Sequence, residues 1–341
     1  MGTIDLLGPT ADRRQFVRTA AGLGLALPFL GGMVPNAFAQ DATPAPMSHG
    51  GGTTGTPPEG FVLYDPALAP VTAGRKEITV TAMDATVPIS KDVMFAGWTY
   101  DGTIPGKMLR VVEGDTIDFT FKVDPNALIG HSLDFHSARV SPDDRYRTIS
   151  QGEELSYTFD AQYPGVYMYH CGTPPILMHL GAGMYGAMIV DPKEGWSPAR
   201  EFAFVQSEFY PTDDGTGTGT QVSNYVAMLG NGMPSMAVFN GYANQYAENP
   251  IPCAVGEPIR VFVMNAGPNV WSSFHVVGTI FDRAYVNGNP KNELVGLQSI
   301  TIGPGDGAVV EFSLAEPGHY PFVNHSFGHA TQGAVGLFHA Q

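Results

Sequence analysis

The stretch YHCGTPPILMHLGAGM, residues 169–184, concentrates side chains that bind soft metal ions. Cys171 and His179 lie eight residues apart, and Met184 follows five residues later. A blue-copper electron-transfer site uses two histidines and a cysteine, with a weak axial methionine. This loop therefore supplies three of the four ligands of such a site, and we expect His131 to be the missing one.

A second copper site is predicted on the opposite side of the same strands. His170 directly precedes Cys171, and successive side chains of a strand point to opposite faces. The motif GHSLDFH supplies His131 and His136, an odd number of residues apart, which also face opposite sides. His136 and His170 can then bind a second copper, with His325 of VNHS as the best third ligand. An all-imidazole site with an open position suits catalysis on a bound substrate or water. Spacing leaves open whether His325 comes from the same subunit or a neighbour.

Two further residues are candidates for moving protons near that second site. Asp134 lies two residues before His136, on the same face, where its carboxylate would carry protons or merely orient a histidine ligand. His275, in SSFHVVG, is expected to be the counterpart of His131 in a second domain. Freed from metal binding, it would serve as a proton relay or as a core histidine.

Length and composition favour two domains built from strands. The chain has 341 residues, 42 glycines, 28 prolines and only 14% charged residues, as expected for short apolar strands joined by turns. The net charge of −15 argues against nucleic acid or an anionic membrane as a partner. It fits a soluble protein, with or without a basic electron donor. Since Cys171 is the predicted metal thiolate, Cys253 has no disulfide partner and is expected to be a buried structural thiol.

The N-terminus is predicted to be an export signal. Residues 1–39 contain the twin-arginine-like run DRRQFVR, an apolar segment over residues 20–30 and an Ala-Phe-Ala cleavage site. We expect export to a periplasm or a cell surface; the alternatives are an uncleaved anchor or the general secretory route. Residues 40–65, rich in Pro, Gly and Thr, are expected to be a flexible linker.

The rest of the chain reads as two related all-β domains, residues 66–196 and 197–341. Apolar and polar residues alternate over residues 78–82 and 117–123, which predicts half-buried strands. The segment VVEGDTIDFTF is weakly similar to AVGEPIRVFV, and YPGVYMYHC is more clearly similar to EPGHYPFVNH. Aligned on Pro-Gly-x-Tyr, Asn324 falls at the place of Cys171. The sequence therefore predicts two tandem Greek-key β-sandwiches, the second without a thiolate, and a short helix over residues 222–229.

Four motifs together resemble the copper-containing nitrite reductases. They are GHSLDFH, YHCGTPPILMH with GAGMYG, SSFHVVG, and PFVNHS with GAVG, which cover residues 75–341 in the family's order. The spacing of Cys171 and His179 is similar to that of the shorter-loop, outer-membrane type. The resemblance implies two cupredoxin-like domains and two kinds of copper. Type 1 copper would be bound by His131, Cys171, His179 and Met184, and type 2 copper by His136, His170 and His325.

The resemblance also implies an assembly and a reaction. The family is homotrimeric, and its third type 2 histidine comes from the adjacent subunit. Asp134 and His275 match its two proton-handling residues. The reaction would be denitrifying, one-electron reduction of nitrite to nitric oxide and water. A small cupredoxin or c-type cytochrome would supply the electron, which would pass through Cys171 and His170. Val277 departs from the family's usual isoleucine, and the loop at 140–148 is unusually charged.

Two other functions were weighed against nitrite reduction. A laccase-type multicopper oxidase needs several His-x-His pairs, and no two histidines of this sequence lie two residues apart. An electron carrier with type 1 copper alone would need a defective second site, whereas all three candidate histidines are present.

Overall fold

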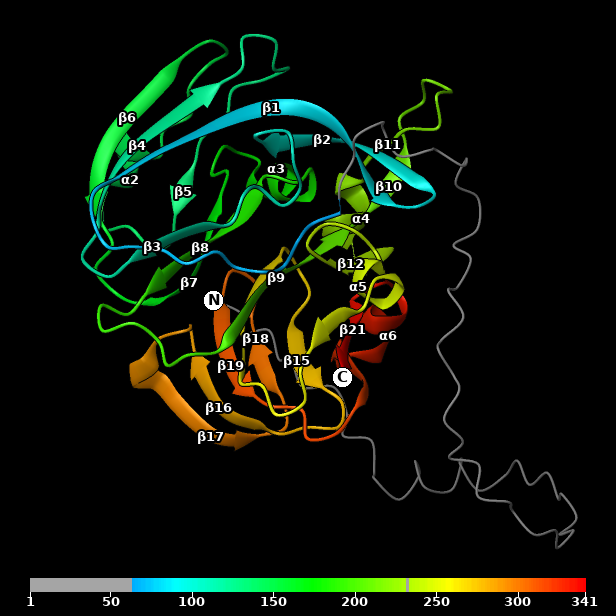
Figure 1. Ribbon diagram of the computed structural model, residues 1–341. Helices are drawn as coiled ribbons and strands as arrows, with labels where there is room; N and C mark the ends of the chain where they lie inside the picture. Colours follow the sequence, from blue (N-terminus) through cyan, green and yellow to red (C-terminus); the bar gives the residue numbers. More distant parts are fainter. Residues whose placement is uncertain (1–62, 231–232) are drawn as a thin grey trace, which may run out of the picture. The chain divides into compact units, whose positions relative to one another are not determined.

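Strands dominate the computed structural model, which describes residues 63–230 and 233–341 (Figure 1). The predicted export signal and most of the predicted linker lie outside the described residues. Helices are short: α2 (Pro142–Arg145), α3 (Ile176–Gly181), α4 (Tyr225–Gly230), α5 (Gln245–Glu248), α6 (Phe327–Thr331) and the 3-10 helix η1 (Pro290–Asn292). Within the part of the chain that the structure describes, no helix is long and apolar enough to cross a membrane.

The first sandwich packs a six-stranded sheet against a four-stranded one. The six-stranded sheet has the order β10-β11-β2-β1-β4-β6, and the four-stranded sheet the order β3-β8-β7-β5. Large aromatic side chains such as Phe119 and Phe135 fill the space between them. The strands are β1 (Lys76–Ser90), β2 (Val93–Tyr100), β3 (Leu109–Val112), β4 (Thr116–Val123), β5 (Asp134–Phe135), β6 (Glu154–Asp160), β7 (Gly165–His170), β8 (Tyr185–Asp191), β10 (Pro211–Asp213) and β11 (Gln221–Ser223).

The second sandwich repeats this design with sheets of six and five strands. Their orders are β12-β9-β14-β19-β16-β17 and β13-β21-β20-β15-β18. The buried thiol of Cys253 is free and lies in the core between them, as predicted. The strands are β9 (Arg200–Phe209), β12 (Met236–Phe239), β13 (Ile251–Cys253), β14 (Ile259–Gly267), β15 (Ser272–Val276), β16 (Phe281–Val286), β17 (Glu293–Leu297), β18 (Ile300–Ile302), β19 (Gly307–Phe312), β20 (Gly318–Asn324) and β21 (Val335–Ala340).

The prediction of two all-β sandwiches is confirmed, with local differences. The alternating segments at 78–82 and 117–123 lie in β1 and β4. The helix expected over 222–229 forms as α4, which starts three residues later. The charged loop at residues 140–148 contains the short helix α2. Strands β10 and β11 follow residue 197 in the chain, yet they extend the sheet of the first sandwich.

A third apolar core joins the two sandwiches and places β7 between two cores. Val166 and Met168 of β7 pack with side chains of β9, β14 and β19, including Val309. The alternate residues, Tyr169 and then Cys171, point into the core of the first sandwich. In Figure 1, β7 and β8 accordingly run beside β9 and β19. The two faces of one strand therefore serve two different environments.

Buried charges tie the same region together. The guanidinium of Arg260 donates to Glu311 Oε1 (2.7 Å) and Glu201 Oε1 (2.8 Å) from strands on either side of β14. Glu201 also accepts from Arg110 of β3 (2.7 Å), which binds Asp191 at the end of β8. This chain of ion pairs links the four-stranded sheet to the second sandwich.

Removing Arg260 should destabilise the protein strongly. The Arg260 side chain is only 2% exposed, so Arg260→Met leaves two carboxylates without their shared partner at a cost of about 3 kcal/mol. Lys122→Met is the matched control, because that side chain is 47% exposed and pairs with Glu154 on the surface, and it should cost less than about 1 kcal/mol. Urea unfolding followed by tryptophan fluorescence measures both. Equal midpoints for the two variants would contradict this account of the network.

Candidate metal centres

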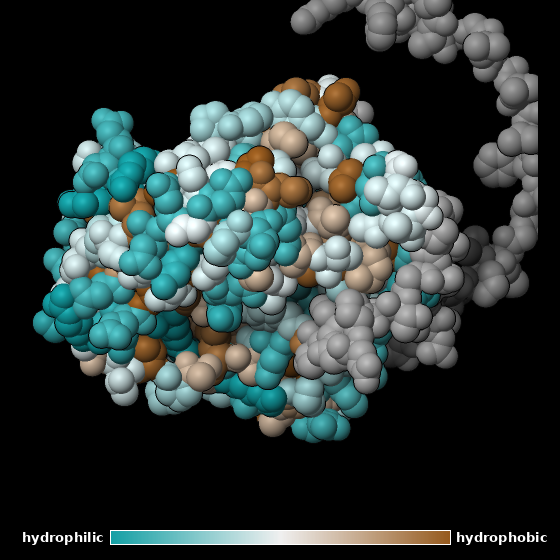
Figure 2. Space-filling view, turned by 90° about the horizontal axis from the view of Figure 1, so that it is seen from above, coloured by the Kyte–Doolittle hydropathy of each residue, from teal (hydrophilic) through white to brown (hydrophobic). Residues whose placement is uncertain are grey.

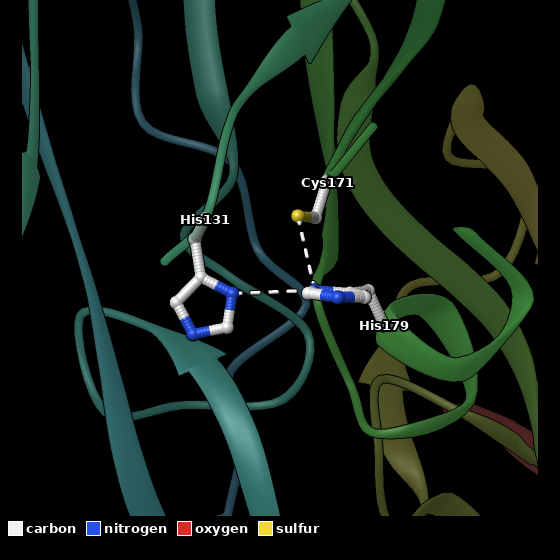
Figure 3. Close-up of side chains that lie close together, drawn as sticks. All are labelled: His131, Cys171 and His179. Atoms are coloured by element: carbon white, nitrogen blue, oxygen red, sulfur yellow. Dashed lines mark hydrogen bonds between the residues drawn. The ribbon is translucent and has the colours of Figure 1, made fainter. Parts of the chain in front are cut away.

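The first centre brings together the three predicted ligands His131, Cys171 and His179 (Figure 3). The Nδ1 atoms of the two histidines are 3.2 Å apart, and the Cys171 sulfur lies 3.2 Å from His179 Nδ1. None of the three side chains is more than 1% exposed. Two imidazole nitrogens and a thiol sulfur thus converge inside a pocket closed to water.

Local backbone contacts hold this centre in place. Cys171 follows the last residue of β7, and its N–H donates to the carbonyl of Met184 (3.1 Å). The N–H of Met184 in turn donates to the carbonyl of His179 (3.1 Å), which lies in α3. Met184 is fully buried in the same core as Cys171. The loop therefore closes on itself and places the predicted axial methionine next to the cysteine.

The chemistry of the donors fits copper. Burial lowers the pKa of His131 and of His179 to about 4, so both rings are neutral and able to bind metal at neutral pH. The N–H of Ser132 points to the Cys171 sulfur at 3.5 Å, a contact that stabilises a thiolate. Ring nitrogen Nε2 of His131 is buried without a hydrogen-bond partner among the described residues. Two histidines, a cysteine and a methionine are the donor set of a blue-copper centre.

The second centre contains Asp134, His136 and His170. The Nε2 atoms of the two histidines are 3.1 Å apart, and an Asp134 carboxylate oxygen lies 4.0 Å from His170 Nε2. Pairing of β5 with β7 sets Asp134 opposite His170. The other ring nitrogen of His170 is 3.0 Å from the carbonyl of Cys171, which orients the ring. The structure thus brings these three together on the side of β7 opposite the Cys171 sulfur, as predicted.

A turn of the second sandwich reaches this centre. The ring of His136 is hydrogen-bonded to the backbone of Gly305, between β18 and β19. A side chain at Gly305, where φ is +84°, would stand 3.4 Å from the His136 ring. The His136 side chain reaches the surface, but desolvation of its ring by the surrounding protein, together with the neighbouring His170, lowers its pKa. The turn fixes the ring so that its Nε2 faces His170.

His325 and His275 lie together, but away from the second centre of the same chain. Their ring centroids are 5.5 Å apart, and the His325 side chain is exposed just after β20. Among the described residues, only the two groups above gather three or more metal-binding side chains, and neither includes His325. A ring nitrogen of His275 contacts the carbonyl of Gln298. One chain therefore carries two separate halves of the predicted three-histidine site.

The second sandwich repeats the hydrogen bonds that surround the first centre but lacks most of its metal-binding side chains. The N–H of Ser273 donates to the Asn324 side chain (3.0 Å), as Ser132 does to Cys171. His329 Nδ1 lies 3.3 Å from the Asn324 amide, and the N–H of Asn324 donates to Ala334. Asn324 therefore replaces Cys171, as predicted. His329 stands in the place of His179, Ala334 in that of Met184, and Ser272 in that of His131.

This register corrects the predicted counterpart of His275. His275 pairs with Val323, the residue before Asn324, as Asp134 pairs with His170, the residue before Cys171. The counterpart of His275 is therefore Asp134, and the prediction that it matches His131 was wrong. The two candidate proton-handling residues occupy the same position of the duplicated fold.

Sequence reasoning missed several residues around the first centre. One is His329: the distance from His179 to Met184 recurs between His329 and Ala334 and would have identified it as the counterpart of His179. Trp98, whose ring centroid lies 4.8 Å from that of His179 and 5.7 Å from that of His131, carried no sequence signal. The contact of Gly305 with His136 spans the two sandwiches and also had none.

Comparisons with known proteins agree with this architecture. The profile of the multicopper oxidases matches residues 81–195. A copper-containing nitrite reductase of Neisseria meningitidis serogroup A is 37% identical over 276 residues, which cover 80% of this chain and 71% of that protein. A solved copper nitrite reductase from Nitrosomonas europaea is 38% identical with a TM-score of 0.72, over 79% of this chain and 94% of that one. The Cu-containing nitrite reductase from Thermus scotoductus SA-01 is 32% identical with a TM-score of 0.71, over 78% and 62%.

Replacing the thiol should remove the colour of the metal-loaded protein. Cys171→Ser deletes the sulfur whose charge transfer to copper gives an intense visible band, so the band should disappear while other bound copper remains. Absorption spectra and copper content per chain measure this. Cys253→Ser, which changes the other buried thiol, should keep the band. A band that persists in Cys171→Ser would show that another residue supplies the donor.

Proposed function

This chain belongs to the copper-containing nitrite reductases and reduces nitrite, and we propose that it does so with the two centres described above. The observation that carries the proposal is that two groups of metal-binding side chains, with no residue in common, converge on opposite faces of β7. Bound copper supplies one-electron redox chemistry and an open position for nitrite. The overall reaction takes one electron and two protons per nitrite and yields nitric oxide and water.

In this proposal the buried centre is type 1 and the outward centre is type 2. His131, Cys171 and His179 with Met184 fit the first because they are buried and include a thiol. His136 and His170 fit the second. Since Cys171 and His170 are consecutive residues, a single peptide unit joins the two centres. The 3.0 Å contact between the His170 ring and the Cys171 carbonyl holds that link in one geometry.

We propose that His325 completes the second centre from an adjacent subunit of a homotrimer. Two features support this arrangement: the incomplete histidine pair on the first sandwich and the exposed His325 on the second. His275 would then enter the neighbour's site together with His325, because their rings are in contact. Asp134 and His275 would face nitrite from two different subunits.

Asp134 and His275 are proposed to deliver the two protons. The Asp134 side chain is one-third exposed, so it can exchange protons with water, and one of its oxygens is within 4.0 Å of His170. The His275 ring is held by the carbonyl of Gln298, which favours a proton on that nitrogen and leaves the other free for the substrate side.

We further propose that the protein is exported and works in denitrification. The twin-arginine-like run and the Ala-Phe-Ala site support export to a periplasm or cell surface. A small cupredoxin or c-type cytochrome would be the electron donor, and the acidic net charge of −15 favours a basic one.

A neutral residue at position 134 should slow turnover without removing metal. Asp134→Asn keeps the size of the side chain but cannot carry a proton, so nitric oxide release should fall roughly 10²-fold. Copper content and the visible band should not change. Asp143→Asn, in the exposed helix α2, is the control. Unchanged turnover in Asp134→Asn would make this residue purely structural.

Mixed subunits test whether the second centre is shared. His136→Ala and His325→Ala should each lose the second copper and nearly all nitrite reduction, while the visible band persists. Chains of both variants, co-expressed with different tags and purified as hybrids, should regain activity, because some interfaces then hold both intact halves.

His319→Ala, which removes an exposed histidine of β20, is the matched control and should leave each property intact. Hybrids that stay inactive, combined with full copper in His325→Ala, would show that the third ligand is not His325 of a neighbour.

A further inference from the structure

Three polar side chains are buried in the second sandwich behind the turn that contacts His136. Hydrophilic side chains cover much of the face of the protein drawn in Figure 2, as expected for groups that water solvates. Gln206, Asn265 and Ser272 are exceptions, because each is at most 2% exposed. Burial of such groups costs free energy unless they are hydrogen-bonded, so their partners indicate what they hold in place.

The backbone of Asn265 clamps the turn between β18 and β19. Its carbonyl accepts from the N–H of Gly305 (2.7 Å), and its N–H donates to the carbonyl of Asp306 (3.0 Å). The N–H of Asp306 closes the turn on the carbonyl of Gly303 (3.0 Å). The His136 ring is hydrogen-bonded to the backbone of Gly305. Asn265 is therefore bonded directly to the group that orients this ring.

The side chain of Asn265 fixes its own backbone. The residue lies where β14 shifts its register against β9, and such a shift interrupts the ladder of hydrogen bonds between the strands. The amide Nδ2 donates to the carbonyls of Val270 (2.7 Å) and Ile302 (3.1 Å), and Ile302 ends β18 just before the turn. Oδ1 accepts from the N–H of Gly267 (3.1 Å). The amide thus supplies the contacts that hold β14 and β18 together at the turn.

The same buried group reaches the strand that carries the other half of the second centre. Gln206 Nε2 donates to Asn265 Oδ1 at 3.4 Å, and Gln206 Oε1 accepts from the hydroxyl of Ser272 (2.7 Å). Ser272 is the first residue of β15, which contains His275. One hydrogen-bonded group in each chain therefore contacts the supports of both halves of the proposed site.

We propose that Asn265 is a positioning residue of the second centre. This proposal rests on the function proposed above. Asn265 touches neither metal nor nitrite, but it holds the turn at Gly305. The turn in turn holds the His136 ring with its Nε2 toward His170. Gln206 supports Asn265 from behind, so it contributes less. Loss of the Asn265 amide releases the turn, and the His136 ring then loses its fixed orientation.

Asn265→Ala removes the amide and leaves two buried carbonyls without this donor. Asn240→Ala is the matched control. Asn240 is another buried asparagine of the second sandwich, 3% exposed, and its amide bonds the backbone of Val205 (2.7 Å) and Ala203 (3.0 Å). It follows β12, on the edge of β9 opposite β14. Because φ of Asn240 is +52°, alanine there also strains the backbone, so this control should destabilise the fold at least as much.

Two further variants set the scale of the effect. Gly305→Ala perturbs the turn directly, because φ is +84° and the new Cβ would stand 3.4 Å from the His136 ring. Gln206→Met keeps the length of the side chain but removes the amide that supports Asn265. It should have a smaller effect than Asn265→Ala.

The first readout needs no metal. Hydrogen exchange of the copper-free protein, followed by mass spectrometry, reports how well the bonded amides of residues 303–306 are protected. Exchange in this segment should become about tenfold faster in Asn265→Ala, because the turn then opens more often. It should keep the parent rate in Asn240→Ala.

The second readout is copper binding at the second centre. Copper-free protein is titrated with Cu(II), and the bound metal is followed by electron paramagnetic resonance. Asn265→Ala should weaken binding at the second centre about tenfold and change the hyperfine splitting of that copper, with Gln206→Met intermediate. The visible band, which reports the buried centre, should not change. Asn240→Ala should match the parent in all three properties.

Each outcome decides for or against Asn265. If Asn265→Ala exchanges and binds copper as the parent does, while Gly305→Ala alters both, the amide does not position the centre and the proposal is wrong. If Asn240→Ala changes the second centre as much as Asn265→Ala, general loss of stability explains the effect, which also overturns the proposal. Should Asn265→Ala fail to fold, Gln206→Met decides by the same readouts.

The proposed function can fail separately. Copper-loaded parent protein that releases no nitric oxide from nitrite with an artificial reductant would overturn nitrite reduction at these centres. Hydrogen exchange and the copper titration would still show whether Asn265 positions the His136 ring, because neither readout depends on turnover.

Discussion

The alternation of side chains along β7, a strand buried on both faces, is the constraint on which the rest of the structure depends. Odd-numbered residues up to Cys171 point into the core of the first sandwich, and even-numbered ones up to His170 point toward the second. A single strand end thus delivers a soft thiol to a dry pocket and an imidazole to a partly exposed one. A shift of one residue in its pairing with β8 would exchange the two side chains and destroy both centres.

Duplication explains why the second sandwich carries so many residues at equivalent positions with different chemistry. Hydrogen bonds from Ser132 to Cys171 and from Ser273 to Asn324 have the same geometry in the two halves. Of the four donor positions of the first centre, only that of His179 still carries a metal-binding side chain in the second sandwich, namely His329. The Nδ1 atom of His329 contacts an amide instead of a thiol. The backbone contacts that close the loop around the first centre are therefore also present at its counterpart, where the N–H of Asn324 donates to Ala334 and the N–H of Ala334 donates to His329. Asp134 and His275 show the converse case, in which one position acquired a titratable group in each half.

How much of this was visible in the sequence depended on how local each feature is. Period-two alternation through YMYHC and the spacing from Cys171 to Met184 are set by neighbouring residues, so the two centres and the all-β fold could be predicted. The register of β15 against β20 could not, because residue type alone aligns the histidine of SSFH with a histidine of GHSLDFH. Only the strand pairing shows that His275 matches Asp134. Two contacts join segments that are far apart in the chain: Gly305 with His136, and Trp98 with His179. No pattern within these segments predicts either contact.

In the proposed function the two centres face opposite requirements, and the structure gives them different degrees of burial. A centre that only relays electrons works best when water is excluded, because fixed, desolvated ligands reorganise little; its histidines accordingly are neutral, with pKa values lowered to about 4. A centre that consumes protons needs water, and there Asp134 is one-third exposed and His136 lies at the surface. The half-buried ring of Trp98 lies against both histidines and helps to keep these ligands dry.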